Sequence, residues 1–301
     1  MRDHTLWKYI LEEIFEDFLR FFYPNADEIF DFTRGFVFLD KELEDLFPAN
    51  EANNVRYVDK LVKVWLKNGN EEWILIHIEV QGDYQKIFSE RMFRYFYLIF
   101  NKHNVKITAW AIFTDTNKKF KPASFETSFL GTGVKYWFNT YKIFDQKDAE
   151  LKNSDNPFAI VVLTVLLALK KEKVNEVKLI DLKIEIAKNL LKRNFPKEKI
   201  KKIFHFLKFY VRFNDENSLI FDKKFDHLLE KSESMGLEEY ILERERKQYM
   251  AKGIEQGIVL NPNEVIRNLR VEEKFSIEKI AKIVRLSTVR VREILEEMEI
   301  V

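Results

Sequence analysis

The sequence predicts a layered α/β fold that is followed by a helical extension. Three observations support this prediction: an amphipathic helix pattern opens the chain of 301 residues, strand and helix patterns then alternate up to residue 144, and helical patterns dominate from Asn153 onward. Helices and strands that alternate in this way pack as layers around a shared core. A hydrophobic fraction of 46% supplies enough apolar surface for such a core.

The first predicted element is a helix between Trp7 and Phe22. Large apolar residues recur there at intervals of three and four positions, which is the period of an α-helix. Pro24 ends the pattern, because proline does not continue a helix. Residues 25–54 are expected to form an irregular connection with at most a short helix or strand.

An antiparallel β-hairpin is predicted next. Two strand-like segments, 55–66 and 73–81, flank the turn-forming residues Asn68-Gly69-Asn70. Side chains alternate between the two faces of a strand. Glu79 and Gln81 therefore share one face of the second strand, and the other face carries the aliphatic residues Ile74, Ile76, Ile78 and Val80.

Helix and strand patterns continue to the end of the chain. The expected elements are, in order, a helix at 84–101, a buried strand at 105–114, a strand at 134–144, a buried helix at 158–169, two or three helices within 175–231 and a charged, glycine-punctuated helical stretch at 237–258. Asn153 to Pro157 supply the cap residues and the proline that favour a helix start. The tail, 276–298, has the outline of a helix-turn-helix in which Ser276 is the first cap and residues 285–287 form the turn.

Composition excludes several classes of function. The chain has no cysteine, so it has no disulfide, no thiolate zinc site and no cysteine nucleophile. No glycine-rich phosphate loop is present, so no nucleotide cofactor is expected. The longest apolar run, Phe158 to Leu169, is too short to span a bilayer, and the first residues lack a secretory pattern. We therefore expect a cytoplasmic protein without a membrane segment.

Charge is distributed unevenly along the chain. Residues 1–54 hold 5 Lys or Arg and 13 Asp or Glu, whereas residues 170–212 hold 14 Lys or Arg and 5 Asp or Glu. A basic stretch of this kind can attract phosphate backbones, most clearly at Lys192–Lys202. A solvated helical face is the alternative explanation, and the charge pattern alone slightly favours it.

Three polar residues on the predicted hairpin carry the strongest chemical signal. Asp59 lies on the first strand, and Glu79 and Gln81 lie on the second. Two carboxylates on adjacent core strands repel each other and are costly to desolvate. A divalent cation between them removes this cost, and oxygen ligands with open water positions suit Mg²⁺ or Mn²⁺. The alternative is that these carboxylates only end their strands in water.

Several segments together resemble the Rpn family of recombination-promoting nucleases and related transposase-like proteins, within the PD-(D/E)XK superfamily. The resemblance is carried by Tyr57-Val58-Asp59-Lys60-Leu61-Val62, Ile76-His77-Ile78-Glu79-Val80-Gln81 and Arg91-Met92-Phe93-Arg94-Tyr95. The opening helix, the segment Ser154–Ala159 and the glycine-punctuated stretch Gly236–Gly257 are also similar. The resemblance thus covers most of the chain.

The resemblance implies roles for individual residues. Asp59 and Glu79 match the two acidic metal ligands, and the carbonyl of Val80 is a further ligand. Gln81 stands where the wider superfamily has a lysine, and its amide can only orient water or phosphate. A glutamate of the first helix often assists in the superfamily; Glu12, Glu13 and Glu16 are the candidates here, and Glu13 stands for them among the site residues while the choice stays open. The predicted DNA contacts are Arg91, Arg94, Lys192 and Arg193.

Taken together, these expectations describe a PD-(D/E)XK core with a mixed central sheet at 1–150, a packed helical extension at 151–231 and a helical C-terminal region at 232–301. The implied activity is metal-dependent hydrolysis of DNA with low sequence specificity, in recombination, transposition or defence against phage. The alternative is a catalytically degenerate DNA-binding or regulatory protein that acts through its C-terminal helices and a dimer interface. Whether the chain forms a homodimer stays open at this point. In the tail, Thr288, Arg290 and Arg292 could contact DNA. Packing of the two tail helices on this protein or on a partner is the favoured alternative.

Overall fold

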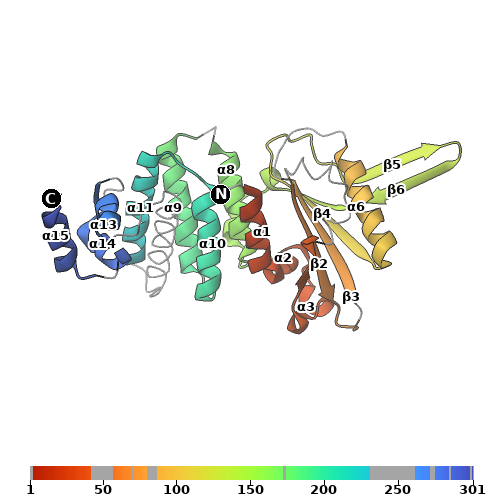
Figure 1. Ribbon diagram of the computed structural model, residues 1–301. Coiled ribbons are helices and arrows are strands. Elements are labelled where there is room, and N and C mark those ends of the chain that lie inside the picture. Colours follow the sequence, from red (N-terminus) through yellow and green to blue (C-terminus); the bar gives the residue numbers. More distant parts are fainter. Residues whose placement is uncertain are drawn as a thin grey trace. The chain divides into compact units, whose positions relative to one another are not determined.

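The computed structural model describes residues 3–41, 57–69, 71–79, 87–171, 174–230, 262–271, 275–284, 286–298 and 300. The chain divides into two compact units, which we call the N-terminal unit (Met1–Phe225) and the C-terminal unit (Asp226–Val301). The first contains both the predicted α/β core and the predicted helical extension. Its mixture of helices and strands confirms the predicted α/β class (Figure 1).

A five-stranded mixed sheet organises the core of the N-terminal unit (Figure 1). Its strands, in spatial order, are β1 (Val37–Phe38), β2 (Tyr57–Trp65), β3 (Glu71–Glu79), β4 (Ile107–Phe113) and β7 (Asn139–Lys142). The pairs β1–β2 and β2–β3 are antiparallel, whereas β3–β4 and β4–β7 are parallel. The predicted hairpin is confirmed as β2–β3, and Gly69 in its turn has a φ of 85°, which glycine adopts without strain.

Helices cover both faces of this sheet (Figure 1). Helix α6 (Phe88–His103) packs on the face that carries Leu61 and Ala111, together with the other members of one apolar cluster. The opposite face carries Trp110, whose ring lies 4.2 Å from that of Phe22, between centroids. The sheet is therefore buried on both sides, as expected for its parallel part.

The first predicted helix is interrupted. It forms α1 (Asp3–Glu13) and α2 (Phe15–Phe22), because Ile14 leaves the helical region with φ −132° and ψ 34°. The break lets each part bury its own apolar face: α1 packs against β2 and α10, and α2 packs against α8. The expected irregular connection then contains the short helix α3 (Ala26–Ile29), the 3₁₀ turn η1 (Phe32–Arg34) and β1.

The single strand predicted at 134–144 is wrong. The chain forms β6 (Thr132–Trp137), which pairs with β5 (Ser124–Phe129) in a separate two-stranded sheet, and then β7 in the main sheet. Phe138 lies between β6 and β7 and is buried in the cluster under α6. Burial of this ring bends the chain from one sheet into the other, which a strand pattern cannot indicate.

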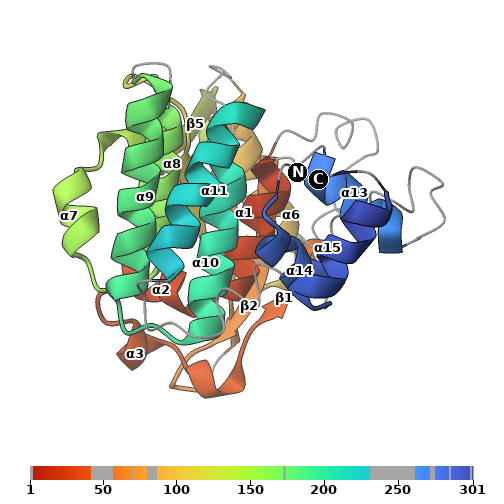
Figure 2. The same ribbon diagram turned by 90° about the vertical axis from the view of Figure 1, so that its left-hand side faces the viewer.

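In the described residues the extension consists of α7 (Asp148–Asn153) after the turn η2 (Ile143–Asp145), α8 (Phe158–Leu169), α9 (Glu176–Lys192), α10 (Lys197–Tyr210) and α11 (Asp215–Glu230), whose last turn passes the boundary between the units at Phe225. The predicted helix start is confirmed, since the Asn156 side chain accepts a hydrogen bond of 2.8 Å from the Phe158 amide. Figure 2 shows α8, α9 and α10 side by side, with α1 against α10. Among the residues that the structure describes, no helix is long and apolar enough to cross a membrane.

The described part of the C-terminal unit consists of three short helices around a small core of its own. These are α13 (Pro262–Val271), α14 (Ile277–Val284) and α15 (Thr288–Glu297). The predicted pair at 276–298 is confirmed as α14 and α15, and Ser276 and Ser287 cap them through their hydroxyl oxygens. Helix α13 was not predicted, and the glycine-punctuated stretch 237–258 lies outside the described residues.

Candidate active site

The positions of Asp59 and Glu79 meet on the β2–β3 hairpin. The register pairs Asp59 with His77 and Tyr57 with Glu79, so the two acidic positions are diagonal neighbours on one face. Diagonal residues on two adjacent antiparallel strands lie about 7–8 Å apart. The side chains of Asp59 and Glu79, and all of Val80 and Gln81, lie outside what the structure describes. Among the side chains that it does describe, no three acidic or histidine groups converge on a metal position.

Helix α6 covers the face on which these two positions lie. Leu61 follows Asp59 by two residues on the same strand, and it is fully buried in the cluster that contains Phe88 and Met92 of α6. Two predicted site residues, Arg91 and Arg94, come from the first two turns of this helix. The predicted acids and arginines are thus brought to one side of the sheet.

The two arginines differ in their surroundings. Arg91 is half-buried, and its guanidinium carbon lies 5.5 Å from the centre of the Phe88 ring. Arg94 is exposed. A cation over an aromatic face is held in place by the ring's negative face. Arg91 is therefore fixed near the start of α6, whereas Arg94 faces solvent.

A buried ion pair at the ends of the parallel strands escaped sequence analysis. Across the sheet, Glu79 pairs in register with Phe113 and Phe113 pairs with Lys142. The Lys142 ammonium lies 2.5 Å from a carboxylate oxygen of Asp115, and both side chains are almost fully buried. The second Asp115 oxygen accepts a 2.8 Å hydrogen bond from the Asn117 amide. An acid directly after the buried strand at 105–114 is the signal that could have found it, because ligand sites gather where parallel strands end.

Glu13 does not lie at the predicted site. Its carboxylate forms an ion pair with Lys202 of α10. Its neighbour Glu12 forms one with Lys60, a fully buried lysine that is also 2.5 Å from Asp40. Lys60 lies on the face opposite to Asp59, because adjacent strand residues alternate. Helix α1 thus presents its acids to that opposite face, and the selection of Glu13 gains no support.

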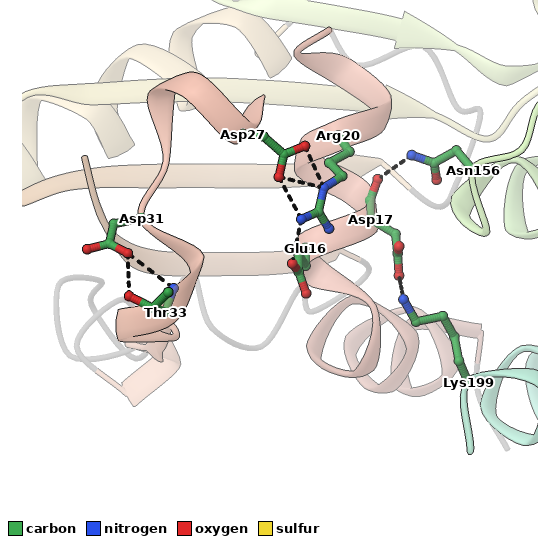
Figure 3. Close-up of polar contacts among 8 residues, drawn as sticks. All are labelled: Glu16, Asp17, Arg20, Asp27, Asp31, Thr33, Asn156 and Lys199. Atoms are coloured by element: carbon green, nitrogen blue, oxygen red, sulfur yellow. Dashed lines mark hydrogen bonds and ion pairs between the residues drawn. The ribbon is translucent and has the colours of Figure 1, made fainter. Parts of the chain in front are cut away.

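The basic stretch at 170–212 is largely paired within the protein. Lys199 of α10 lies 2.6 Å from Asp17 of α2, and Figure 3 shows this pair beside Asn156, which donates a 3.0 Å hydrogen bond to the Asp17 carbonyl. Burial raises the pKa of the Asp17 carboxyl, although Lys199 opposes the rise. The acidic start of the chain and its basic helix α10 therefore attract each other, which explains the uneven charge without nucleic acid.

A network on α2 and α3 shows the same preference for internal partners. Figure 3 shows the Arg20 guanidinium against Asp27 and Glu16, at 2.7 Å from each carboxylate. In the same view Asp31, which caps the turn η1, accepts hydrogen bonds from the hydroxyl and amide of Thr33 within that turn. These contacts fix the connection between α2 and β1.

Arg193 and Lys192, both predicted to contact DNA, have different positions. The Arg193 guanidinium donates hydrogen bonds to the carbonyls of Lys152 and Ser154 and, at 2.8 Å, to the Asn189 side chain. Lys192 is exposed. Arg193 therefore joins the end of α9 to the end of α7, and its assignment to DNA binding gains no support.

This contrast predicts different effects on stability. Replacing Arg193 with alanine is expected to lower the free energy of unfolding by about 2 kcal/mol, because three buried or half-buried acceptors lose a charged donor. Lys192→Ala is the matched control and is expected to change it by less than about 0.5 kcal/mol. Urea unfolding measures both. A drop in DNA affinity at unchanged stability in Arg193→Ala would show that the arginine acts on nucleic acid instead.

In the C-terminal unit, α15 presents the polar residues that were considered for DNA contact. Thr288, Arg290 and Arg292 are exposed, and Arg290 lies 2.9 Å from Glu293 on the same helix. The side chains that hold the three helices together are apolar. Contact of this surface with DNA or with another protein stays a prediction.

No family model, curated protein or solved structure matches the chain significantly.

Proposed function

We propose that the N-terminal unit is a divalent-metal-dependent DNA endonuclease of the PD-(D/E)XK kind, with low sequence specificity. The β2–β3 register carries this proposal, because it makes Asp59 and Glu79 diagonal neighbours at one end of a mixed sheet. A mixed central sheet between helices agrees with the resemblance. The biological setting, in recombination, transposition or defence against phage, rests on the resemblance alone.

The donor set fits a magnesium-sized ion. Asp59 and Glu79 offer carboxylate oxygens, and the backbone carbonyl of Val80 adds a neutral one, which is the ligand chemistry of Mg²⁺ and Mn²⁺. When bound, such an ion supplies Lewis acidity to the phosphate and lowers the pKa of a bound water.

The chain's own residues bind and orient the substrate. We assign the phosphate group of the substrate to Arg91 and Arg94, which belong to the helix over the same sheet face. Gln81 orients water or phosphate through its amide, which carries no charge at any pH. Contacts of this kind address the DNA backbone and not the bases, so low sequence specificity follows.

The neighbours of Glu79 in the sheet also support the proposal. Glu79 ends β3 next to Phe113, and the Asp115–Lys142 pair fixes the chain just beyond the end of β4. A catalytic group needs a position that is held by its surroundings. Carboxylates that only ended their strands in water would not require such support.

The first test is cleavage of supercoiled plasmid in Mg²⁺. Wild-type protein is expected to nick or linearise the plasmid in Mg²⁺ and to do neither in EDTA. Asp59→Ala and Glu79→Ala are each expected to lose about 1,000-fold in rate, because several kcal/mol of transition-state stabilisation disappear with the metal. Asp181→Ala is the control, since this α9 acid is an exposed partner of Lys224.

Equal cleavage by wild type and by both acidic variants sinks the nuclease proposal. Binding of DNA that is unaffected by EDTA, without new DNA ends, supports the degenerate DNA-binding alternative. Removing residues 262–301 then tests whether the C-terminal helices carry that binding.

A further inference from the structure

The β5–β6 hairpin projects past α6, away from the main sheet (Figure 1). Six residues in each strand, at about 3.4 Å per residue, extend about 20 Å. The register pairs Phe129 with Thr132, so the loop consists of Leu130 and Gly131 alone. Both have positive φ, 44° and 83°, which is the geometry of a tight two-residue turn. Asparagine or glycine normally fills the first position, and a leucine there is unfavourable for the turn itself.

The inner half of the hairpin is anchored on α6. Phe125 stacks on Phe93 with 5.2 Å between ring centroids, and Tyr136 lies 4.8 Å from Phe96. Tyr136 is buried. These contacts hold the base of the hairpin on the helix that also carries Arg91 and Arg94.

The outer half of the hairpin keeps its apolar character without a partner in the described residues. Phe129 is 77% exposed and Leu130 is 88% exposed, and Val134 on the same face is partly exposed. Apolar groups gathered at the end of a projecting element mark an interaction site. An interaction also explains why leucine occupies a turn position that suits it poorly.

The charge around the hairpin identifies its partner. Residues 87–142 contain nine Lys or Arg and three Asp or Glu, while the whole chain is nearly neutral. Lys142 is buried on Asp115, and Lys121 and Lys135 pair with Asp145 and Glu126, which leaves six basic side chains against Glu90. Lys118 and Lys119 are exposed in the loop that leads into β5, and within the described part of the chain no acid pairs with either. A positive surface beside exposed apolar groups is complementary to nucleic acid, whose phosphates are anionic and whose bases are flat and apolar on their faces.

We propose that the β5–β6 hairpin is a DNA-binding arm. Phe129 and Leu130 insert at a base step and partly unstack it, as apolar wedges do in architectural DNA-binding proteins. Lys118 and Lys119 precede β5 at the base of the hairpin, so they contact phosphates farther along the same duplex. This inference rests on the proposed nuclease function and names how its substrate is gripped.

A second copy of the chain is the weaker candidate for the partner. Phe129, Leu130 and Val134 together expose much less than the about 800 Å² per partner that a stable interface buries. The net positive charge of the region would also repel the same region of another copy. DNA needs only a small wedge, because its phosphates supply most of the affinity.

The test uses full-length protein and a duplex that contains 2-aminopurine, with Ca²⁺ in place of Mg²⁺. The double variant Phe129→Thr/Leu130→Asn removes the apolar tip and installs residues that suit a strand and a tight turn, so the hairpin stays folded. The wild-type protein is expected to raise 2-aminopurine fluorescence, because the wedge unstacks the base. The double variant is expected to bind the duplex about tenfold more weakly and to lose this rise. Val177→Thr, an exposed apolar residue of α9, is the matched control and is expected to bind like wild type.

A second variant tests the phosphate contacts. Lys118→Ala/Lys119→Ala is expected to reduce the slope of log affinity against log salt by about 2, one for each lysine. It is expected to keep the fluorescence rise, since the wedge is intact.

Wild-type affinity and fluorescence in the tip variant would overturn the proposal. A change in oligomeric state at unchanged DNA affinity would do so as well, and would make the hairpin a contact between copies. The nuclease proposal is judged separately. A fluorescence rise without plasmid cleavage supports the DNA-binding arm and contradicts the nuclease proposal. Cleavage without the fluorescence rise supports the nuclease proposal and contradicts the arm.

Discussion

Replacing Lys142 with methionine is expected to lower the free energy of unfolding of the N-terminal unit by about 3–5 kcal/mol. The substitution leaves the Asp115 carboxylate buried without its cation. It also removes the 3.3 Å hydrogen bond from the lysine to the Phe120 carbonyl. The reason for the large effect is that a lone buried charge cannot be solvated. Urea unfolding followed by circular dichroism measures it.

Two further variants make this prediction specific to the pair. The double variant Asp115→Asn/Lys142→Met is expected to be clearly more stable than the sum of the two single effects, because no charge is left uncompensated and asparagine still accepts from the Asn117 amide. Lys147→Met is the control, since Lys147 and Glu150 form an exposed pair worth at most about 1 kcal/mol. Additive single effects would show that the two side chains do not act as a pair.

Lys183 is expected to make the stability of the N-terminal unit depend on pH. Its ammonium is buried between α9 and the end of α10, where it donates hydrogen bonds of 3.1 and 2.8 Å to the carbonyls of Lys208 and Val211. The rings of Phe213 and Phe221 lie 4.7 and 4.0 Å from it. Burial lowers the pKa of Lys183 to about 7 in the folded protein, from a usual value of 10.5.

The direction of the effect follows from proton binding. Between pH 7 and about 10 the unfolded chain keeps the proton on Lys183 and the folded chain releases it, so stability rises with pH over this window. Below pH 7 the folded state holds the buried charge, and the full cost, of the order of a few kcal/mol, is present. Asp222 reduces this cost and Lys208 increases it, because the first is anionic and the second is cationic.

Lys183→Met tests this expectation, since methionine fills a similar volume without a charge. The variant is expected to lack the rise, so that its stability relative to wild type is greatest at pH 6 and declines toward pH 10. Thermal unfolding at several pH values measures this difference. Lys188→Met, at a solvent-exposed position of the same helix, is the control and should follow the wild-type curve. A constant difference between Lys183→Met and wild type would contradict the lowered pKa.

Local patterns in the sequence were sufficient for most elements. The hairpin follows from two strand-like segments around Asn68-Gly69, and the start of α8 follows from Asn156 and Pro157. The α14–α15 pair follows from its capping serines. In each case the deciding interaction joins residues a few positions apart, so a single sequence contains it. The adjacency of Asp59 and Glu79 also belongs here, because hairpin pairing and strand alternation determine it.

The choice among distant partners needed the tertiary structure. No local pattern shows that Lys199 pairs with Asp17, that Glu13 pairs with Lys202 or that Lys142 pairs with Asp115. The break at Ile14 and the bend at Phe138 have the same origin, since each serves the burial of rings by elements far away in sequence.

By itself, then, the sequence determined the α/β class, the hairpin with its two acids and the capped helices, because these depend on local geometry and on the period of apolar residues. Only the tertiary structure decided which charges neutralise one another and which apolar groups stay exposed at the tip of β5–β6. The physical reason is that charge and apolar surface are satisfied by whatever lies nearby in space, and closeness in space between distant segments is a property of the folded chain.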